Sequence, residues 1–208
     1  MEFCRAVRIR NTVWRRKERS MNLYIADLHF GHKNVIGFDH RPFLDVDEMD
    51  HAMIDLWNGR VQDEDDVYII GDFANRNGRA DEWYLRQLKG KKHLIIGNHD
   101  KKMLSNPRAL ACLAEPPEKL AGIVDVAANG EKRIVIMCHY PIASWYRKES
   151  GAYHIFGHIH NRDTEEQRFM LAQERSVNAA AALNGYTPAS LNELIEHKKT
   201  YERFFHVQ

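Results

Sequence analysis

The chain has 208 residues, of which 44% are hydrophobic and 10% aromatic, a composition typical of a folded protein with a sizeable core. Its net charge is only +1, and no apolar run approaches the roughly 18 residues that a membrane-spanning helix needs. The three cysteines, Cys4, Cys112 and Cys138, form no C-x-x-C pair and leave one over, which argues against a disulfide framework. We therefore expect a cytoplasmic protein without membrane association.

Charge is distributed unevenly along the chain. Residues 1–20 contain seven Lys or Arg and two Glu, so this segment carries +5 while residues 21–208 carry −4. A basic arm of this kind can bind nucleic acid. Met21 directly precedes the first clear strand, however. The favoured interpretation is an extension outside the fold, followed by one domain over residues 21–208.

The first strand is expected over residues 22–26 and stops at Asp27-Leu28-His29. Alternate residues at the end of a strand project to the same side, so the carboxylate of Asp27 and the imidazole of His29 can converge on one cation. A mixed set of oxygen and nitrogen ligands suits Mn, Fe, Zn, Co or Ni.

Helical spacing of apolar residues predicts amphipathic helices over residues 45–59 and 80–88. The acidic run 63–66 between them is interpreted as a solvated turn. A second buried strand over residues 67–70 ends on Gly71-Asp72, so two apolar strands in succession terminate in a carboxylate.

The third strand, residues 93–96, leads into Gly97-Asn98-His99-Asp100. The glycine allows a sharp turn or the close approach of a ligand. Asn98 offers a neutral oxygen, and His99 offers an imidazole, a side chain suited to acid–base chemistry. Asp100 is a carboxylate that could orient the imidazole of His99.

Prolines interrupt any long helix over residues 101–121, and four further strands and a helix are expected beyond them. These elements are a hairpin over 122–127 and 132–138, strands over 153–156 and 175–178, and a helix after Ser190-x-x-Glu193, which has capping-box spacing. The second hairpin strand ends on His139, and the next strand ends on His158 and His160. His154, which alternates with Phe156, is left outside the expected site.

Strands that alternate with helices predict an α/β fold, in which ligands bind beyond the carboxyl ends of the strands. Five strands of this chain end in side chains that can bind a metal. These side chains are Asp27 and His29, Asp72, Asn98 and His99, His139, and His158 with His160. A single histidine at such a place is uninformative, but five strand ends of the same kind indicate a metal centre.

In this order, the motifs D-x-H, G-D, G-N-H-D, H and G-H-x-H resemble the signature of the calcineurin-like metallophosphoesterases. The resemblance extends from Asp27 to His160. The short motifs DLHFGH, RPF, CHYP and GHIH are similar to those of a small bacterial and phage branch of predicted phosphoesterases. The resemblance implies a two-sheet β-sandwich flanked by helices, in αββα order, with the metal site at the carboxyl ends of the strands.

The resemblance also implies a role for each residue. The first metal ion would be bound by Asp27, His29, Asp72 and His160, and the second by Asp72, Asn98, His139 and His158. His99 would donate a hydrogen bond or proton to the leaving-group oxygen, with Asp100 holding its ring. The expected cofactors are two divalent metal ions, with manganese ahead of iron, zinc, nickel or cobalt.

Elementary chemistry is consistent with these roles. Two cations about 3.5–4 Å apart can clamp the attacking and leaving oxygens of an in-line displacement, and a water between them supplies hydroxide at pH 7. A shared ligand should be a carboxylate, which has two oxygens and a negative charge, and Asp72 meets that requirement. The expected function is hydrolysis of a small phosphorylated or nucleotide-type monoester or diester by the bridging hydroxide, with His99 as the acid.

Two residues near the first ligand pair are candidate contacts to the phosphate of the substrate. These residues are His32 and Arg41. A guanidinium group can bind a phosphate through two parallel hydrogen bonds.

Three other functions remain open. Ser/Thr protein phosphatases of the same superfamily continue the second motif as G-D-x-x-D-R-G, whereas the sequence from Gly71 onward reads GDFANRN here. This difference counts against the protein-phosphatase branch. A non-catalytic metal-binding scaffold would lack His99 or several ligands, and this chain has all of them. A nucleic-acid-directed phosphodiesterase could use residues 1–20 but is not favoured over a small-substrate enzyme. The oligomeric state is not predicted.

Overall fold

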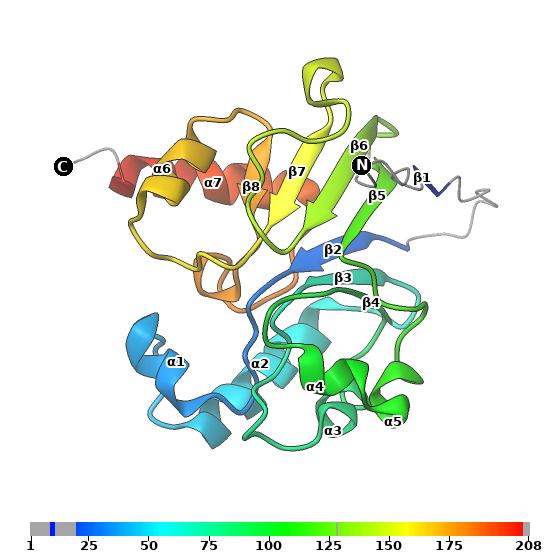
Figure 1. The fold of residues 1–208 in the computed structure, drawn as a ribbon, viewed down its shortest axis with the longest axis vertical. Helices are drawn as coiled ribbons and strands as arrows, with labels where there is room; N and C mark the ends of the chain where they lie inside the picture. Colours follow the sequence, from blue (N-terminus) through cyan, green and yellow to red (C-terminus); the bar gives the residue numbers. More distant parts are fainter. Residues whose placement is uncertain (1–8, 11–19, 128, 206–208) are drawn as a thin grey trace, which may run out of the picture.

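The computed structural model describes residues 9–10, 20–127 and 129–205, and its strands form two sheets (Figure 1). Five strands make one sheet in the order β1-β5-β6-β7-β8, and three parallel strands make the other in the order β2-β3-β4. The strands are β1 (Ile9–Arg10), β2 (Asn22–Ile25), β3 (Asp66–Ile70), β4 (Lys91–Ile95), β5 (Leu120–Val126), β6 (Lys132–Cys138), β7 (Tyr153–Phe156) and β8 (Ser176–Asn178). The expectation of an α/β fold with two sheets flanked by helices is confirmed.

Helices α1 to α5 lie with the three-stranded sheet, and α6 and α7 lie beside the five-stranded sheet (Figure 1). The helices are α1 (Lys33–Phe38), α2 (Val46–Arg60), α3 (Asp81–Leu85), α4 (Lys101–Leu104), α5 (Pro107–Leu110), α6 (Glu165–Leu171) and α7 (Leu191–Phe205). The capping box before α7 is confirmed. The backbone N–H of Ser190 donates to the Glu193 carboxylate at 2.7 Å, and the N–H of Glu193 donates to the Ser190 hydroxyl at 3.4 Å.

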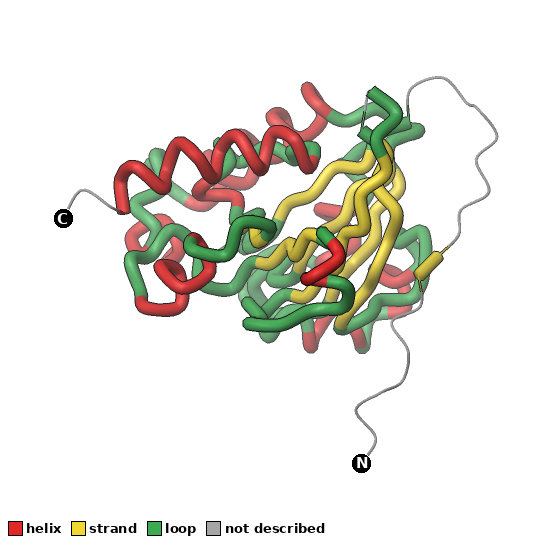
Figure 2. Tube along the Cα trace, turned by 90° about the horizontal axis from the view of Figure 1, so that it is seen from above, coloured by secondary structure: helices red, strands yellow, loops and turns green. Residues whose placement is uncertain are grey.

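The alternation of side chains along β2 shows how one strand serves two cores. Leu23 and Ile25 belong to the buried cluster that includes Trp57 of α2. Tyr24 belongs to a second cluster, which includes Ile155 of β7 and lies between the sheets. In Figure 2 the strands run alongside one another through the molecule, with α7 along one flank. This two-sided burial fixes the register of β2, because a shift by one residue would exchange its two faces.

The directions of the strands bring several carboxyl ends to one side of the molecule. Strands β5 and β6 form the expected antiparallel hairpin, whereas β7 and β8 add in parallel to β6. The outer face of this sheet at Ile136 is covered by Trp145 and Ala152 of the loop between β6 and β7. In the expected αββα arrangement a helix would cover this face of the sheet. Here the loop between β6 and β7 covers the face at Ile136 instead.

Within the segment expected to lie outside the fold, Ile9–Arg10 pairs in parallel with β5, while residues 1–8 and 11–19 lie outside the described residues, so the expectation for this segment stays a prediction. Two other expectations are corrected at this level. The run 63–66 is not fully solvated, because Asp65 is buried and accepts hydrogen bonds from the backbone N–H groups of Met21 and Gln62. The helix expected over 80–88 is limited to α3. No described helix is long and apolar enough to cross a membrane.

Candidate metal centre

Most of the expected ligand residues have a left-handed backbone conformation, which L-residues rarely adopt. The φ angles are 54° at Asp27, 51° at His29, 54° at Asp72, 72° at His158 and 52° at His160. Each such residue costs about 1–3 kcal/mol and persists only where its surroundings enforce it. The loops that follow β2, β3 and β7 are therefore held by contacts strong enough to offset this strain.

Glycines let these loops approach one another more closely than side chains would permit. A Cβ at Gly97 would lie 2.3 Å from Oδ1 of Asp72, and a Cβ at Gly71 would lie 2.3 Å from Nδ1 of His139. Such contacts are far inside van der Waals distance. The glycine that precedes an expected ligand is thus a packing requirement of the site as well as a turn residue.

Asp100 ties two of the loops together through their backbones. Its carboxylate accepts hydrogen bonds from the N–H groups of Asp72, Phe73 and Gly97 at 3.0, 2.9 and 2.7 Å. The expectation that Asp100 holds the ring of His99 is therefore corrected, since the hydrogen bonds that occupy its carboxylate come from the backbone. Asp100 instead fixes the loops after β3 and β4.

Six of the seven expected ligands converge in two groups that share Asp72. The first contains Asp27, His29, Asp72 and His160, all buried, and the second contains Asp72, His139 and His158; within each group, one ligand atom per residue lies within 4.8 Å of the others. In the first group, Nε2 of His160 lies 3.2 Å from Nε2 of His29 and 3.8 Å from Oδ1 of Asp27. Nε2 of His29 lies 3.6 Å from Oδ2 of Asp72.

Asn98 joins the second group through its side-chain oxygen. Its Oδ1 lies 3.1 Å from Nε2 of His139 and 3.0 Å from Nδ1 of His158. Nε2 of His139 lies 3.5 Å from Oδ2 of Asp72, and its Nδ1 is 2.9 Å from the backbone oxygen of Ile70. Because a carbonyl oxygen only accepts, Nδ1 of His139 carries a proton, and Nε2, which faces Asn98 and Asp72, is the nitrogen that would bind a metal ion.

Burial and mutual charge perturb the acids and bases of this cluster. Burial raises the pKa of Asp27 to about 6, in spite of the neighbouring His160 and His139. Burial would also raise the pKa of Asp72, but the hydrogen bond and charge of His139, with the charge of His29, hold it well below its usual range. Burial lowers the pKa of His139, but its contact with Asp72 and the charge of Asp27 outweigh that effect and raise it to about 9.

These ligand types fit divalent metal ions. Carboxylate oxygens, an amide oxygen and neutral imidazole nitrogens converge from separate loops, and this mixed set suits the borderline ions Mn, Fe, Co, Ni and Zn. The two buried carboxylates, Asp27 and Asp72, repel each other where no positive charge lies between them. A cation relieves that repulsion, and Asp72, which belongs to both groups, has two oxygens to share.

His99 and His32 lie at the edge of the cluster. The side chain of His99 is 42% exposed, and its Nε2 lies 4.0 Å from Oδ2 of Asp72. Its ring centroid is 5.0 Å from that of His29 and 6.1 Å from that of His32. Burial and the nearby charges of His99 and Arg41 lower the pKa of His32, whose Nδ1 is buried without a hydrogen-bond partner. Both histidines are thus placed beside the expected ligands.

Arg41 does not have the expected role of a phosphate contact. It is 4% exposed, and its guanidinium group donates to the backbone oxygens of Leu28 and Asp27 at 2.8 and 2.9 Å. It also donates to Asp39 at 3.0 Å. A buried guanidinium group with these partners stabilises the loop that carries Asp27. Its donors are used within the protein and are not available to a substrate.

Asp39 is a residue of the site that the sequence reasoning missed. Its carboxylate oxygens lie 2.9 and 2.8 Å from Nδ1 of His160, although the two residues are separated by 121 positions. The sequence feature that could have indicated Asp39 is the segment FDHRPF, in which Asp39 lies two residues before Arg41. Periodicity could not identify it because Asp39 follows the short helix α1 rather than a strand.

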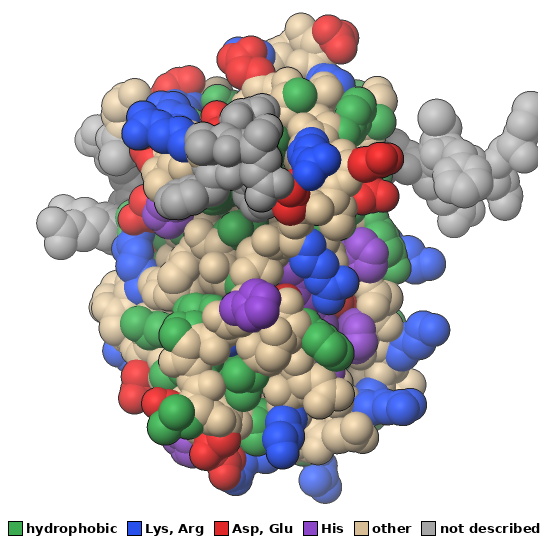
Figure 3. Space-filling model, turned by 90° about the vertical axis from the view of Figure 1, so that its left-hand side faces the viewer, with side chains coloured by type: hydrophobic (Ala, Val, Ile, Leu, Met, Phe, Trp, Pro, Cys, Tyr) green, Lys and Arg blue, Asp and Glu red, His purple; other side chains and the backbone are tan. Residues whose placement is uncertain are grey.

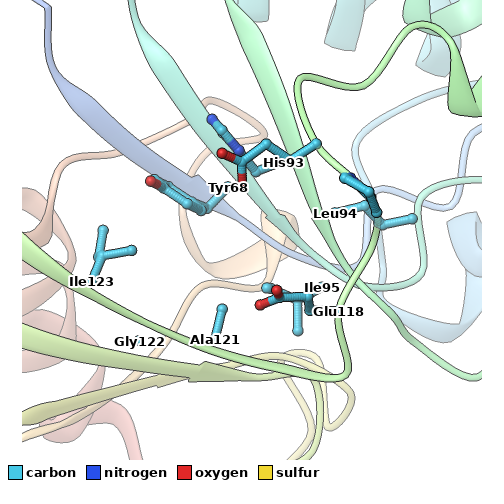
Figure 4. A pocket seen from close by; sticks show the side chains of 10 residues that line it. Tyr68, His93, Leu94, Ile95, Glu118, Ala121, Gly122 and Ile123 are labelled. Atoms are coloured by element: carbon cyan, nitrogen blue, oxygen red, sulfur yellow. The ribbon is translucent and has the colours of Figure 1, made fainter. Parts of the chain in front are cut away.

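On the face of the molecule in Figure 3, several histidine side chains gather near the middle, with Lys and Arg side chains beside them. A separate cavity of about 30 Å³ between β4 and β5 is lined in part by Tyr68, His93, Ile95, Glu118 and Ile123 (Figure 4). It has room for about one water molecule. It shares no residue with the metal-ligand groups and is too small for a substrate.

No protein-family model matches the chain. It is 33% identical over 175 residues to the uncharacterized protein MJ1445 of Methanocaldococcus jannaschii, which spans 83% of this chain and 88% of that protein. It is 28% identical to the gene 66 protein of Mycobacterium phage D29 over 67% of this chain and 78% of that protein. Among solved structures, the protein of unknown function AQ665 from Aquifex aeolicus superposes with a TM-score of 0.61 and 26% identity, over 86% of this chain and 99% of that one.

Proposed function

The chain belongs to the same family as the uncharacterized Methanocaldococcus jannaschii protein MJ1445, and from the site that it carries we propose that it is a dimetal phosphoester hydrolase of the calcineurin-like type. One observation carries the proposal: two groups of ligand atoms share the buried carboxylate of Asp72, with His99 exposed beside them. The order of these residues along the chain is also that of the metallophosphoesterase motifs.

The first metal ion would be held by Asp27, His29, Asp72 and His160, and the second by Asp72, Asn98, His139 and His158. Bound there, two divalent cations would supply Lewis-acid activation of the phosphate and of the attacking water. Two ligand carboxylates against two dications leave the occupied site with net positive charge, which favours an anionic phosphoester.

His99 is the proposed general acid. Its backbone N–H donates to Oδ1 of Asp72 at 2.8 Å, which fixes the residue at the rim of the cluster. Its half-exposed imidazole is accessible to a substrate that rests on the cluster, whereas the ring of His139 is buried. The proton it donates would neutralise the leaving alkoxide or phenoxide oxygen. His32, beside it, is the remaining candidate contact to the phosphate.

The experiment compares hydrolysis of p-nitrophenyl phosphate and of its bis-ester by the wild type and by His99→Ala, each with added Mn²⁺. We expect kcat to fall by about 10²–10⁴-fold in the variant, because general acid catalysis is worth roughly that much. Metal content, measured by elemental analysis, should stay at the wild-type level since His99 is not a proposed ligand. His51→Ala, an exposed residue of α2, is the matched control and should keep full activity.

The results separate the proposal from its alternatives. A wild type that binds metal but hydrolyses neither ester above background would indicate a non-catalytic scaffold. Equal activity of His99→Ala and the wild type, with metals bound, would remove His99 from the mechanism.

A further inference from the structure

Asp39 is the carboxylate that backs one of the proposed metal ligands. Its side chain is fully buried, and both oxygens lie within 2.9 Å of Nδ1 of His160. The guanidinium group of Arg41 approaches the same carboxylate, with Nη2 at 3.0 Å and Nε at 3.3 Å from Oδ2. Asp39 therefore has two cationic or hydrogen-donating partners and no contact with solvent.

These contacts determine which nitrogen of His160 carries the proton. Arginine stays protonated in proteins, and a carboxylate paired with it stays ionised and can only accept hydrogen bonds. Nδ1 of His160 must then be the donor. In the neutral ring the lone pair is left on Nε2, the atom that lies near His29 and Asp27 in the first ligand group.

The same pair also holds the backbone around the first group. Arg41 donates to the backbone oxygens of Asp27 and Leu28, directly before His29. The backbone oxygen of Asp39 accepts from the side-chain amide of Asn161, which directly follows His160. The loops after β2 and β7 are therefore joined through these two residues. These loops carry four proposed ligands with a left-handed backbone, Asp27, His29, His158 and His160.

The second ligand group is backed differently. Nδ1 of His139 contacts the neutral backbone oxygen of Ile70. An imidazole whose N–H donates to a carboxylate is a stronger metal ligand than one whose N–H donates to a carbonyl oxygen. Asp39 should therefore increase the metal affinity of the group that contains His160.

We propose that Asp39 and Arg41 are a positioning pair that fixes the metal-binding tautomer of His160 and the loop carrying Asp27 and His29. The inference rests on the proposed function only in treating these residues as metal ligands. It assigns Asp39 no contact with the substrate.

The first test measures metal affinity, by titration calorimetry of Mn²⁺ into the metal-free full chain. Asp39→Asn keeps the size of the side chain but removes its charge, and we expect binding about 10–100-fold weaker than in the wild type. Asp65→Asn is the matched control. Asp65 is equally buried and accepts two backbone hydrogen bonds, but contacts none of the ligands, so the affinity should change less than about twofold.

The second test reads the tautomer directly, by ¹⁵N NMR of the histidine rings in the metal-free protein at neutral pH. His160 should carry its proton on Nδ1 in the wild type and in Asp65→Asn, and a mixture of tautomers is expected in Asp39→Asn. A residue that only stabilises the fold would not move this signal. If Asp39→Asn does not fold, Arg41→Lys serves in its place. Lysine keeps a positive charge beside Asp39 but lacks the planar guanidinium group that donates to two backbone oxygens. The Nδ1–H tautomer of His160 should therefore persist in Arg41→Lys, while Mn²⁺ affinity falls.

Wild-type affinity together with an unchanged Nδ1–H tautomer in Asp39→Asn would overturn the inference. A wild type that binds no metal would also overturn it. A wild type that binds metal but hydrolyses no phosphoester would end the proposed function alone, because affinity and tautomer are measured without substrate. Failure of the two proposals can thus be told apart.

Discussion

His154 is a buried imidazole outside the ligand groups, held between Trp145 and Phe156. The N–H of Ile142 donates to its Nε2 at 3.3 Å, so the proton lies on Nδ1, which is 3.1 Å from the backbone oxygen of Ile136. Both ring nitrogens are satisfied only in the neutral form. Burial accordingly lowers the pKa of His154 to about 4.

This histidine makes stability depend on pH. Because its folded-state pKa lies below the ordinary value of 6.5, the unfolded chain binds the proton more tightly. The stabilisation is complete above pH 6.5 and is lost as the pH falls from 6.5 toward 4, by about 3 kcal/mol in total. In denaturant titrations across that range, His154→Gln should show a shallower loss of stability than the wild type, and His51→Gln should retain the wild-type slope. Parallel curves for His154→Gln and the wild type would contradict this account.

Single residues were predictable from the sequence where a strand end fixed their direction. Asp27, His29 and Asp72 follow apolar runs, and the period of a strand places them at one edge of a sheet. Asp39 and Arg41 were not predictable in the same way. Their partners lie on other loops, and the contact between Asp39 and His160 exists only once two segments 121 residues apart have met.

At the level of the elements, Gly97, which follows β4, determines how closely two loops that carry proposed metal ligands can pack. A methyl group at Gly97 would lie 2.3 Å from Oδ1 and 2.5 Å from the backbone nitrogen of Asp72. Neither group can move away freely, because Asp72 has a left-handed backbone and its N–H is bonded to Asp100. The strain must therefore spread into both loops.

We expect Gly97→Ala to lower the free energy of unfolding by about 1–3 kcal/mol, the usual cost of overpacking, and to weaken Mn²⁺ binding. Gly59→Ala is the matched control. Gly59 lies in α2 with open space around its Cα, so alanine should stabilise the helix by up to about 1 kcal/mol and leave metal binding unchanged. Thermal unfolding and calorimetry measure both effects. Normal metal affinity in Gly97→Ala would show that the loops are not held as closely as described.

The elements differ in how well the sequence specified them. The strand over 153–156 was predicted with its observed bounds, because a short apolar run flanked by glycines leaves little ambiguity. Helices α4 and α5 were not predicted, since helices of four residues are too short to show a period. A local signal for α5 was present, however. Asn106 caps it by accepting from the N–H groups of Arg108 and Ala109, and Pro107 occupies its first turn.

For the whole molecule, the pairing of strands was the least predictable feature. The hairpin of β5 and β6 follows from its short turn, but the parallel addition of β7 to β6 depends on the loop that contains Trp145. Periodicity alone also leaves open which apolar strands share a sheet. The division into two sheets was expected from the resemblance to a family and not from the residues themselves.

The proposed ligands come from both sheets, so bound metal should stabilise the molecule as a whole. Asp27, Asp72 and Asn98 follow strands of the three-stranded sheet, and His139, His158 and His160 follow strands of the five-stranded sheet. An ion held by members of both sets joins the sheets and is released when they separate. At a free Mn²⁺ concentration 100 times its Kd, one site should add about 2.7 kcal/mol to the free energy of unfolding.

For a chain of this length, that stabilisation corresponds to a rise in Tm of about 5–10 °C, which a chelator should reverse. Asp72→Asn removes the charge that both groups share, so the rise should be largely lost. Asp65→Asn should retain it, because Asp65 lies outside the ligand groups. Amide hydrogen exchange would locate the effect: protection by Mn²⁺ should increase in β3 and in β6 together. An increase confined to one sheet would mean that the metal does not join the two, and an undiminished rise in Tm for Asp72→Asn would place the metal elsewhere.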